Sequence, residues 1–171
     1  MISAEVESAE LVTEGRLGDL YLRHAPGAIR LAYLLTGERA LAEDLVQEAF
    51  TRLAARFMNL RAPEAFEAYL RRTVVNLARS HFRHKKVERA YLDRVGGLAE
   101  TSAFQPDIDQ KEALRHALLG LNERQRTAIV LRFYADLSEA QTAKILGCRI
   151  GTVKSLVSRG MSRLRTEVRD A

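Results

Sequence analysis

The apolar residues of this 171-residue chain recur at the three- and four-residue spacing of helices almost from end to end. The two-residue alternation of a half-buried strand is almost absent. In the first half we expect helices over 26–37, 38–57 and 63–86, with Pro26 in the opening turn of the first. Helical spacing resumes at residue 111 and continues to about residue 168. The pattern predicts an all-α fold.

Between the two helical stretches lies RVGGLAETSAFQPDID, whose glycines, proline and mixed polar residues are typical of a linker. We therefore expect two small helical domains, residues 11–88 and 111–169, joined by a flexible linker over residues 89–110. Residues 1–10 should form a disordered tail.

The net charge of +5 is unevenly distributed. Residues 71–94 contain eight basic and two acidic residues, and residues 144–169 contain seven basic and one acidic. Each expected domain therefore has its own basic patch. Such a distribution indicates a protein that binds nucleic acid at two places.

Several classes of protein are disfavoured by the sequence. Cys148 is the only cysteine, which excludes an internal disulfide and fits a reducing cytoplasm. No apolar run approaches the roughly 18 residues of a membrane span, and the acidic N-terminus does not resemble a signal peptide. The histidines lack acidic partners at metal-ligating spacing, and there is no glycine-rich phosphate loop. We expect a cytoplasmic protein that is not an enzyme and has no metal, cofactor, small-molecule substrate or membrane insertion.

The segment LSEAQTAKILGCRIGTVKSLVSRGMSRLR predicts a helix-turn-helix. Ser138 and Gln141 form a capping box for a helix that ends at Gly147. In the second helix a buried stripe is expected from Val153, Val157, Met161 and Leu164. Another face, flanked by Lys154, carries Thr152, Ser155, Leu156 and Arg159. A short polar face of this kind suits the major groove, although an ordinary helical hairpin with a solvated basic face would show the same spacing.

The long helix over 63–86 has a polar face opposite its apolar stripe. That face carries Arg72, Asn76, Arg79, Arg83 and Lys86. Evenly spaced cations can follow a phosphate backbone, and an amide among them can read a base edge. A solvated basic face is the alternative.

The preceding helix carries a face of opposite character. Asp44, Gln47 and Glu48 lie three and four residues apart and share one side of it. An acidic face in a basic protein does not suit DNA. It is either plain surface or a docking site for a basic protein partner.

Taken in order, AYLLTGERALAEDLVQEAF, AYLRRTVVNLARSHFR and LNERQRTAIVLRFYADLSEAQTAKILGCRIGTVKS resemble the ECF (group IV) sigma factors of bacterial RNA polymerase, in particular an actinobacterial branch. The resemblance covers residues 12–168. It implies a sigma factor that binds core RNA polymerase, recognises the −35 and −10 elements of promoter DNA and helps to melt the promoter. It also implies an anti-sigma factor as a partner.

The resemblance assigns roles to the motifs of the first domain and the linker. EDLVQEAF is similar to the segment that docks on core polymerase, which makes Asp44, Gln47 and Glu48 core-binding candidates. VVNLARSHFR is similar to the segment that opens and reads the −10 element, and Asn76 falls where a flipped base is held. In the linker, Asp107 and Asp109 are implied to mimic RNA phosphates in the polymerase channel.

In the second domain, GTVKS is similar to the −35 recognition helix. The −35 candidates are Arg132, Arg149, Thr152, Lys154, Ser155, Leu156 and Arg159. Two of these depart from the family pattern, because Arg149 stands where a small residue or proline is usual and Leu156 where an arginine is usual. Arg149 removes a helix N-cap, which costs about 1 kcal/mol, but adds a cation for a phosphate. Leu156 removes a hydrogen-bond donor, so we expect an altered −35 preference.

A second hypothesis is a conventional helix-turn-helix regulator whose first domain senses a ligand or dimerises. Its second domain would look much the same. The acidic EDLVQE segment followed by a basic, asparagine-containing helix argues against a sensing domain.

Overall fold

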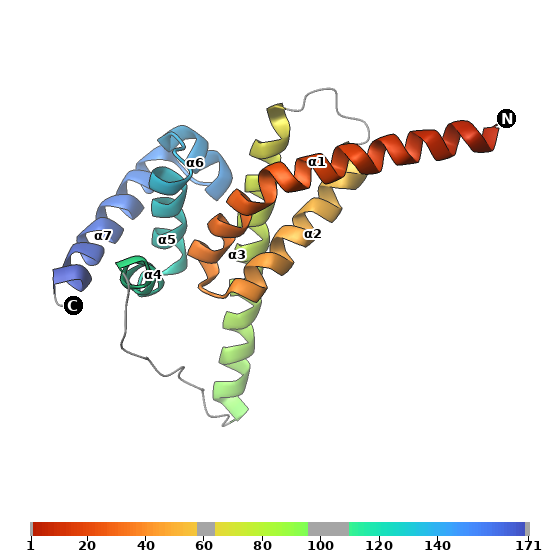
Figure 1. The fold of residues 1–171 in the computed structure, drawn as a ribbon. Coiled ribbons are helices and arrows are strands. Elements are labelled where there is room, and N and C mark those ends of the chain that lie inside the picture. The colour runs from red at the N-terminus through yellow and green to blue at the C-terminus, as the bar shows by residue number, and fades with distance from the viewer. Residues whose placement is uncertain (1, 58–63, 96–109, 170–171) are drawn as a thin grey trace.

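The computed structural model describes residues 2–57, 64–95 and 110–169, which are helical and contain no strand (Figure 1). The first half consists of α1 (Ile2–Thr36), α2 (Arg39–Phe57) and α3 (Glu64–Val95). The second half consists of α4 (Gln110–Leu119), α5 (Glu123–Ile129), the π-helical turn η1 (Val130–Tyr134), α6 (Glu139–Leu146) and α7 (Ile150–Arg169). The all-α prediction is confirmed.

The first three helices pack around a hydrophobic core. Phe66 and Leu70 of α3, Leu35 of α1 and Phe50 of α2 are all buried in one hydrophobic cluster. The Phe50 and Phe66 rings lie 5.4 Å apart. Burial of each large apolar side chain contributes about 1.5–3 kcal/mol. This packing fixes the buried side of α3, and therefore also the direction in which its polar side points.

The prediction that Pro26 opens a helix is wrong, because Pro26 lies inside α1. A proline within a helix removes one backbone hydrogen bond and costs about 3 kcal/mol. The turn before it is nevertheless anchored in the core. Tyr21 packs on Phe50 with ring centroids 4.9 Å apart, and His24 packs on Phe66 at 5.4 Å. Tertiary packing of the turn before Pro26 therefore outweighs the local preference of the proline.

Helix ends also differ from the expected boundaries. The sequence predicts a tail over residues 1–10, whereas α1 begins at Ile2. Residues 89–95, which were expected to belong to the linker, are part of α3, which continues to Val95. Asp107 and Asp109 lie outside the described residues.

The second half contains the expected helix-turn-helix. Ser138 Oγ accepts from the Gln141 amide at 3.2 Å, and Gln141 Oε1 accepts from the Ser138 amide at 2.8 Å, as predicted. Helix α6 ends at Gly147, whose φ of 62° is the left-handed conformation. Val153 of α7 is completely buried, and Gly160 lets α7 approach α5 so closely that a Cβ there would lie 2.5 Å from Ile129 Cδ1.

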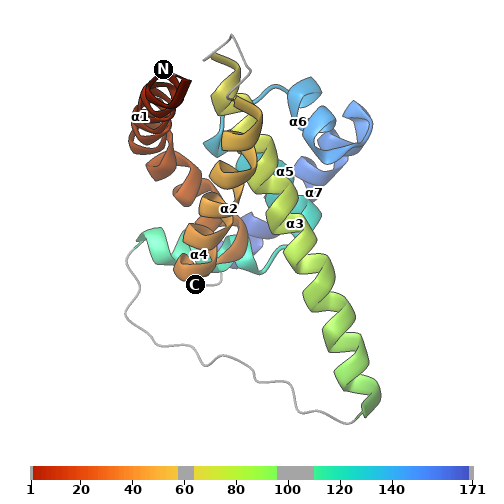
Figure 2. The ribbon, with the colours of Figure 1, turned by 90° about the vertical axis from the view of Figure 1, so that its right-hand side faces the viewer.

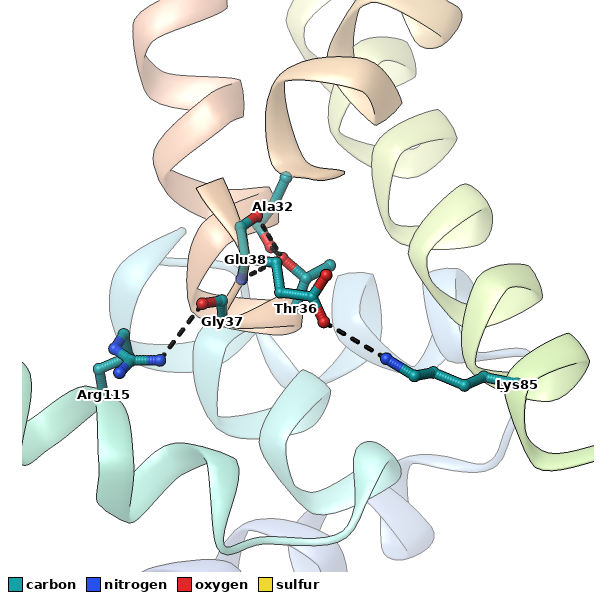
Figure 3. A network of polar contacts seen from close by, with 6 residues as sticks. All are labelled: Ala32, Thr36, Gly37, Glu38, Lys85 and Arg115. Atoms are coloured by element: carbon teal, nitrogen blue, oxygen red, sulfur yellow. Dashed lines mark hydrogen bonds and ion pairs between the residues drawn. The ribbon is translucent and has the colours of Figure 1, made fainter. Parts of the chain in front are cut away.

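The two halves pack against each other (Figure 2): α1 lies beside α4, α5 and η1, and α3 lies beside α5 and α6. The turn between α1 and α2 is one meeting point (Figure 3). There Arg115 Nη1 of α4 donates to the Gly37 carbonyl at 3.2 Å. Glu38 pairs with Lys85 of α3 at 3.3 Å. The turn thus joins α3 and α4 to the end of α1.

Candidate nucleic-acid interface

Most of the expected polar face of α3 is exposed. Arg72, Asn76, Arg83 and Lys86 are open to solvent, while Leu70, Val74 and Leu77 on the other side of the helix are buried. Arg83 Nη2 donates to the Ser80 hydroxyl one turn earlier at 3.4 Å. The exposed line extends over four turns of one helix. It can follow a phosphate backbone with one amide, that of Asn76, available for a base edge.

Arg79 belongs to the same line but is engaged by the second half of the chain. Its Nε lies 3.5 Å from Glu123 Oε1 at the start of α5. Its Nη1 donates to the Leu146 carbonyl at the end of α6, at 3.4 Å. The side chains of Arg79 and Glu123 are both 32% exposed. The −10 candidates are therefore brought together on one helix, but one of them is held by another part of the chain.

A second contact lies one turn further along α3. The guanidinium of Arg126 in α5 lies 5.0 Å from the centre of the Phe82 ring. Arg126 is only 7% exposed, and its Nη1 donates to the Leu119 carbonyl at 3.3 Å. Burial lowers the pKa of Arg126 from its usual value, and the nearby Glu123 carboxylate acts in the opposite direction.

The sequence analysis missed Glu123 and Arg126. A signal for their helix was present, because Asn122 caps α5 by accepting from the Gln125 amide at 3.0 Å. Glu123 and Arg126 lie three residues apart in this helix and therefore share one face. The sequence does not indicate that this face meets α3.

On α7 the candidate −35 face is partly occupied. Lys154, Ser155 and Arg159 are exposed, while Thr152 and Leu156 are half-buried. Leu156 packs against the core, so only part of its side chain is open. The Ser155 hydroxyl donates back to the Gly151 carbonyl at 3.0 Å.

Two arginines flank this face. Arg149 is exposed and precedes α7, and its carbonyl accepts from the Thr152 amide at 2.9 Å. Arg132 lies in the π-helical turn η1, where its half-buried guanidinium donates to the Leu137 carbonyl just before α6. Arg132 therefore anchors the segment that leads into the helix-turn-helix.

The expected acidic face is exposed on α2. Asp44, Gln47 and Glu48 are open to solvent, and Glu48 pairs with Arg52 one turn later. The side chains lie on the surface of the first half, where they are accessible to another protein.

No grouping of histidine, cysteine and carboxylate side chains in the described ranges is suited to hold a metal ion. Within those ranges no helix is long and apolar enough to cross a bilayer. A hollow of about 580 Å³ separates parts of the two halves, with Arg23 and Arg30 of α1 on one side and Tyr134 and Asp136 on the other.

Known proteins resemble the chain over nearly its whole length. Residues 20–87 match the family model for Sigma-70 region 2, and residues 111–164 match the model for Sigma-70, region 4. An RNA polymerase sigma-E factor of Streptomyces antibioticus is 30% identical over 98% of this chain and 88% of its own length. The ECF RNA polymerase sigma factor SigW of Bacillus subtilis is 27% identical over 99% of this chain and 98% of its own length. The sigma factor RpoE of Bartonella quintana, crystallised with the anti-sigma factor NepR, is 29% identical, with a TM-score of 0.69 over 89% of this chain and 96% of that one.

Proposed function

The chain belongs to the ECF sigma factors of bacterial RNA polymerase, and on that premise we propose how its two halves divide promoter recognition between them. As a sigma factor it binds core RNA polymerase and directs transcription initiation at promoters. The match of residues 20–87 to sigma region 2 leaves no basis for a sensing or dimerisation domain there. The conventional regulator is therefore not retained.

The first half, residues 11–88, is proposed to read and open the −10 element. The observation that carries this proposal is the exposed line along α3, which places cations on both sides of the Asn76 amide. Melted DNA presents both phosphates and unpaired base edges, and this line offers a partner for each. The proposed −10 contacts are Arg72, Asn76, Arg79, Arg83 and Lys86.

The second half, residues 111–169, is proposed to read the −35 element through α7. Its exposed Lys154, Ser155 and Arg159 suit the donors and acceptors of the major groove. The remaining proposed −35 contacts are Arg132, Arg149, Thr152 and Leu156. Of these, Arg132 and Leu156 also have contacts within the protein, which restrict how they reach DNA.

The exposed acidic face of α2 is proposed to dock on core polymerase through Asp44, Gln47 and Glu48. Carboxylates here complement a basic partner surface without competing for DNA. For the linker over residues 89–110, the proposal that Asp107 and Asp109 mimic RNA phosphates rests on their charge and on the family.

We also propose an anti-sigma factor as a regulatory partner, because the similar sigma factor of Bartonella quintana was crystallised with one. The site of action is proposed to be the cytoplasm, where core polymerase meets promoter DNA. The chain acts there by binding, without a catalytic group or cofactor of its own.

Run-off transcription tests the proposed function directly. Core polymerase and this chain should give discrete transcripts from a subset of genomic fragments, and core polymerase alone should not. The transcripts supply the −35 and −10 sequences for all later binding measurements. Binding of the chain to DNA without any core-dependent transcript would contradict the proposal.

A further inference from the structure

A hollow of about 580 Å³ lies between α1 of the first half and the segment at η1 in the second half. Three buried apolar side chains line it, those of Ala28 and Leu31 in α1 and Leu70 in α3. Tyr134, which is 43% exposed, lines it from the side of η1. Hollows of about 300–1,000 Å³ that combine apolar walls with a few polar groups are typical of small-molecule sites. The α1–η1 hollow, as we call it, therefore has the size and the lining of a ligand site.

Three arginines line the α1–η1 hollow, and two of them have no ion-pair partner among the residues that the structure describes. Arg71 pairs with Glu67 at 2.7 Å, so these two charges offset each other. Arg23 and Arg30 are exposed and lie about two turns apart along one side of α1. A guanidinium group can bind a phosphate through two parallel hydrogen bonds. The α1 side of the hollow therefore offers one guanidinium group to each of two phosphates.

The backbone beside the hollow is unfavourable on both of its sides. Pro26 and Gly27 follow each other within α1, and they are the two residue types that a helix interior tolerates least. Gly27 lines the hollow, and a Cβ added there would meet no atom within 4 Å, so close packing does not account for the glycine. On the other side, Asp136 has a φ of 49°, a left-handed conformation that is uncommon for residues other than glycine. Because unfavourable backbone of this kind clusters at binding sites, its occurrence on both sides supports a binding role for the hollow.

The side of the hollow opposite these arginines suits a nucleobase. Tyr134 and Asp136 are both exposed, and both line the hollow. An aromatic ring offers a stacking surface to a base. An ionised carboxylate only accepts hydrogen bonds, and the edge of guanine carries two adjacent donors, its N1–H and its amino group. The two sides of the hollow therefore match the two parts of a nucleotide.

We propose that the α1–η1 hollow binds a nucleoside diphosphate, with its phosphates on Arg23 and Arg30 and its base on Tyr134 and Asp136. None of the described side chains proposed to contact DNA or core polymerase lines the hollow, so this site is additional to those contacts. A ligand that binds only the folded chain stabilises it against unfolding. The site therefore predicts both a measurable affinity and a rise in Tm.

Calorimetric titration of the full chain tests the binding. GDP is the probe, because its guanine presents two donors to the Asp136 carboxylate. We expect saturable binding of one GDP per chain, and a higher Tm at saturating GDP. Pyrophosphate and guanosine each supply one part of the ligand, and each should bind about ten-fold or more weakly than GDP.

A double substitution tests the phosphate contacts. Arg23→Gln with Arg30→Gln removes both proposed phosphate partners and should weaken GDP binding by about ten-fold or more. Arg124→Gln with Arg165→Gln is the matched control. It removes the same charge from exposed positions outside the hollow and should bind GDP with unchanged affinity.

A substitution at Gly27 tests the location without changing any charge. Gly27→Leu places a side chain in the hollow and should weaken GDP binding by about three-fold or more. The variant should be at least as stable as the unchanged protein, because leucine is a better helix former than glycine. Gly18→Leu makes the same change on the same helix outside the hollow, where an added Cβ also meets no atom within 4 Å. It should bind GDP normally, and circular dichroism checks the fold of every variant.

Four results would overturn the proposal. The first is the absence of saturable GDP binding to the full chain. The second is pyrophosphate binding as tightly as GDP, because the base would then contribute nothing. The third is an equal loss in the Arg124 and Arg165 variant, since net charge alone would then attract the anion. The fourth is undiminished GDP binding by folded Gly27→Leu, which would place the ligand elsewhere.

Discussion

The ammonium group of Lys154 on α7 lies 3.6 Å from the Glu139 carboxylate at the start of α6. Lys154 is one of the cations proposed to contact −35 DNA, so this carboxylate would compete with a DNA phosphate for its ammonium group. Arg79 and Glu123 show the same relationship at the boundary between the two halves. In both pairs a candidate DNA-binding cation is partly neutralised in the free protein.

Glu139→Gln should therefore strengthen binding to a −35 duplex. An exposed ion pair contributes about 0.2–1 kcal/mol, so its release should raise the affinity by no more than about five-fold. Fluorescence anisotropy with a labelled duplex measures the change. In a Lys154→Gln background the same substitution should give a smaller gain, since no pair remains to be released. Equal gains in both backgrounds would show that only the overall charge matters.

Asp44→Arg combined with Glu48→Arg should abolish binding to core polymerase while leaving the fold intact. Both side chains are exposed, and reversing their charges opposes docking on a basic surface. A pull-down of core polymerase measures the loss, and circular dichroism checks the fold. Asp19→Arg with Glu88→Arg reverses two exposed charges on other helices and should bind core normally. Normal core binding by the folded Asp44 and Glu48 variant would remove α2 from the docking site.

Asn76→Ala should impair promoter opening more than duplex binding. The side chain is exposed, so the fold should not change, and loss of a base contact weakens recognition by about 1–3 kcal/mol. Permanganate reactivity of −10 thymines reports opening, and a gel shift of the closed complex reports binding. If thymine reactivity matches that of the unchanged protein, Asn76 does not hold a base.

Gly37→Ala should destabilise the protein for two separable reasons. Gly37 has a φ of 75°, and a left-handed conformation costs a residue other than glycine about 1–2 kcal/mol. A Cβ there would also lie 2.6 Å from Leu119 Cδ1 of α4, so the packing of the two halves should loosen. Gly147→Ala is the matched control, because its φ is 62° and no atom lies within 4 Å of the added Cβ. Urea unfolding should show a larger loss of unfolding free energy for Gly37→Ala than for Gly147→Ala. Equal losses would mean that the Leu119 side chain moves aside without cost.

The sequence could predict features that depend on neighbouring residues, but it could not predict contacts between segments that lie far apart in the chain. The capping box at Ser138, the end of α6 at Gly147 and the burial of Val153 follow from spacing, because each depends on residues within a few turns. The course of α1 through Pro26 depends on the aromatic contacts of Tyr21 and His24 with α2 and α3, which no local signal reports.

The same limit applies to the candidate site. Exposure of Arg72, Asn76, Arg83 and Lys86 follows from the apolar stripe on the other side of α3. Arg79 is less exposed than these four residues because it pairs with Glu123, forty-four positions further along the chain. Leu156 is also less exposed than expected. Helical periodicity places it beside Ser155, but it does not show that Leu156 packs against the core.

Leu156→Arg should change which bases are preferred in the −35 element. Leu156 is half-buried, so the open part of its side chain offers an apolar contact, and a thymine methyl group is the base feature that such a contact fits. We therefore expect thymine at the base pair facing Leu156. An arginine there would favour guanine, and a further phosphate contact would steepen the salt dependence of log K by about 0.9.

Selection from duplexes randomised at the −35 element measures these preferences. Leu156→Met is the matched control, because it keeps the apolar character and approximate volume and should leave the preferences unchanged. Thermal unfolding of both variants separates lost packing from altered recognition, since Leu156 also contacts the core. If Leu156→Arg remains folded and selects the same base at every position as the unchanged protein, Leu156 serves packing alone, and the groove is read by Ser155, Arg159 and their neighbours.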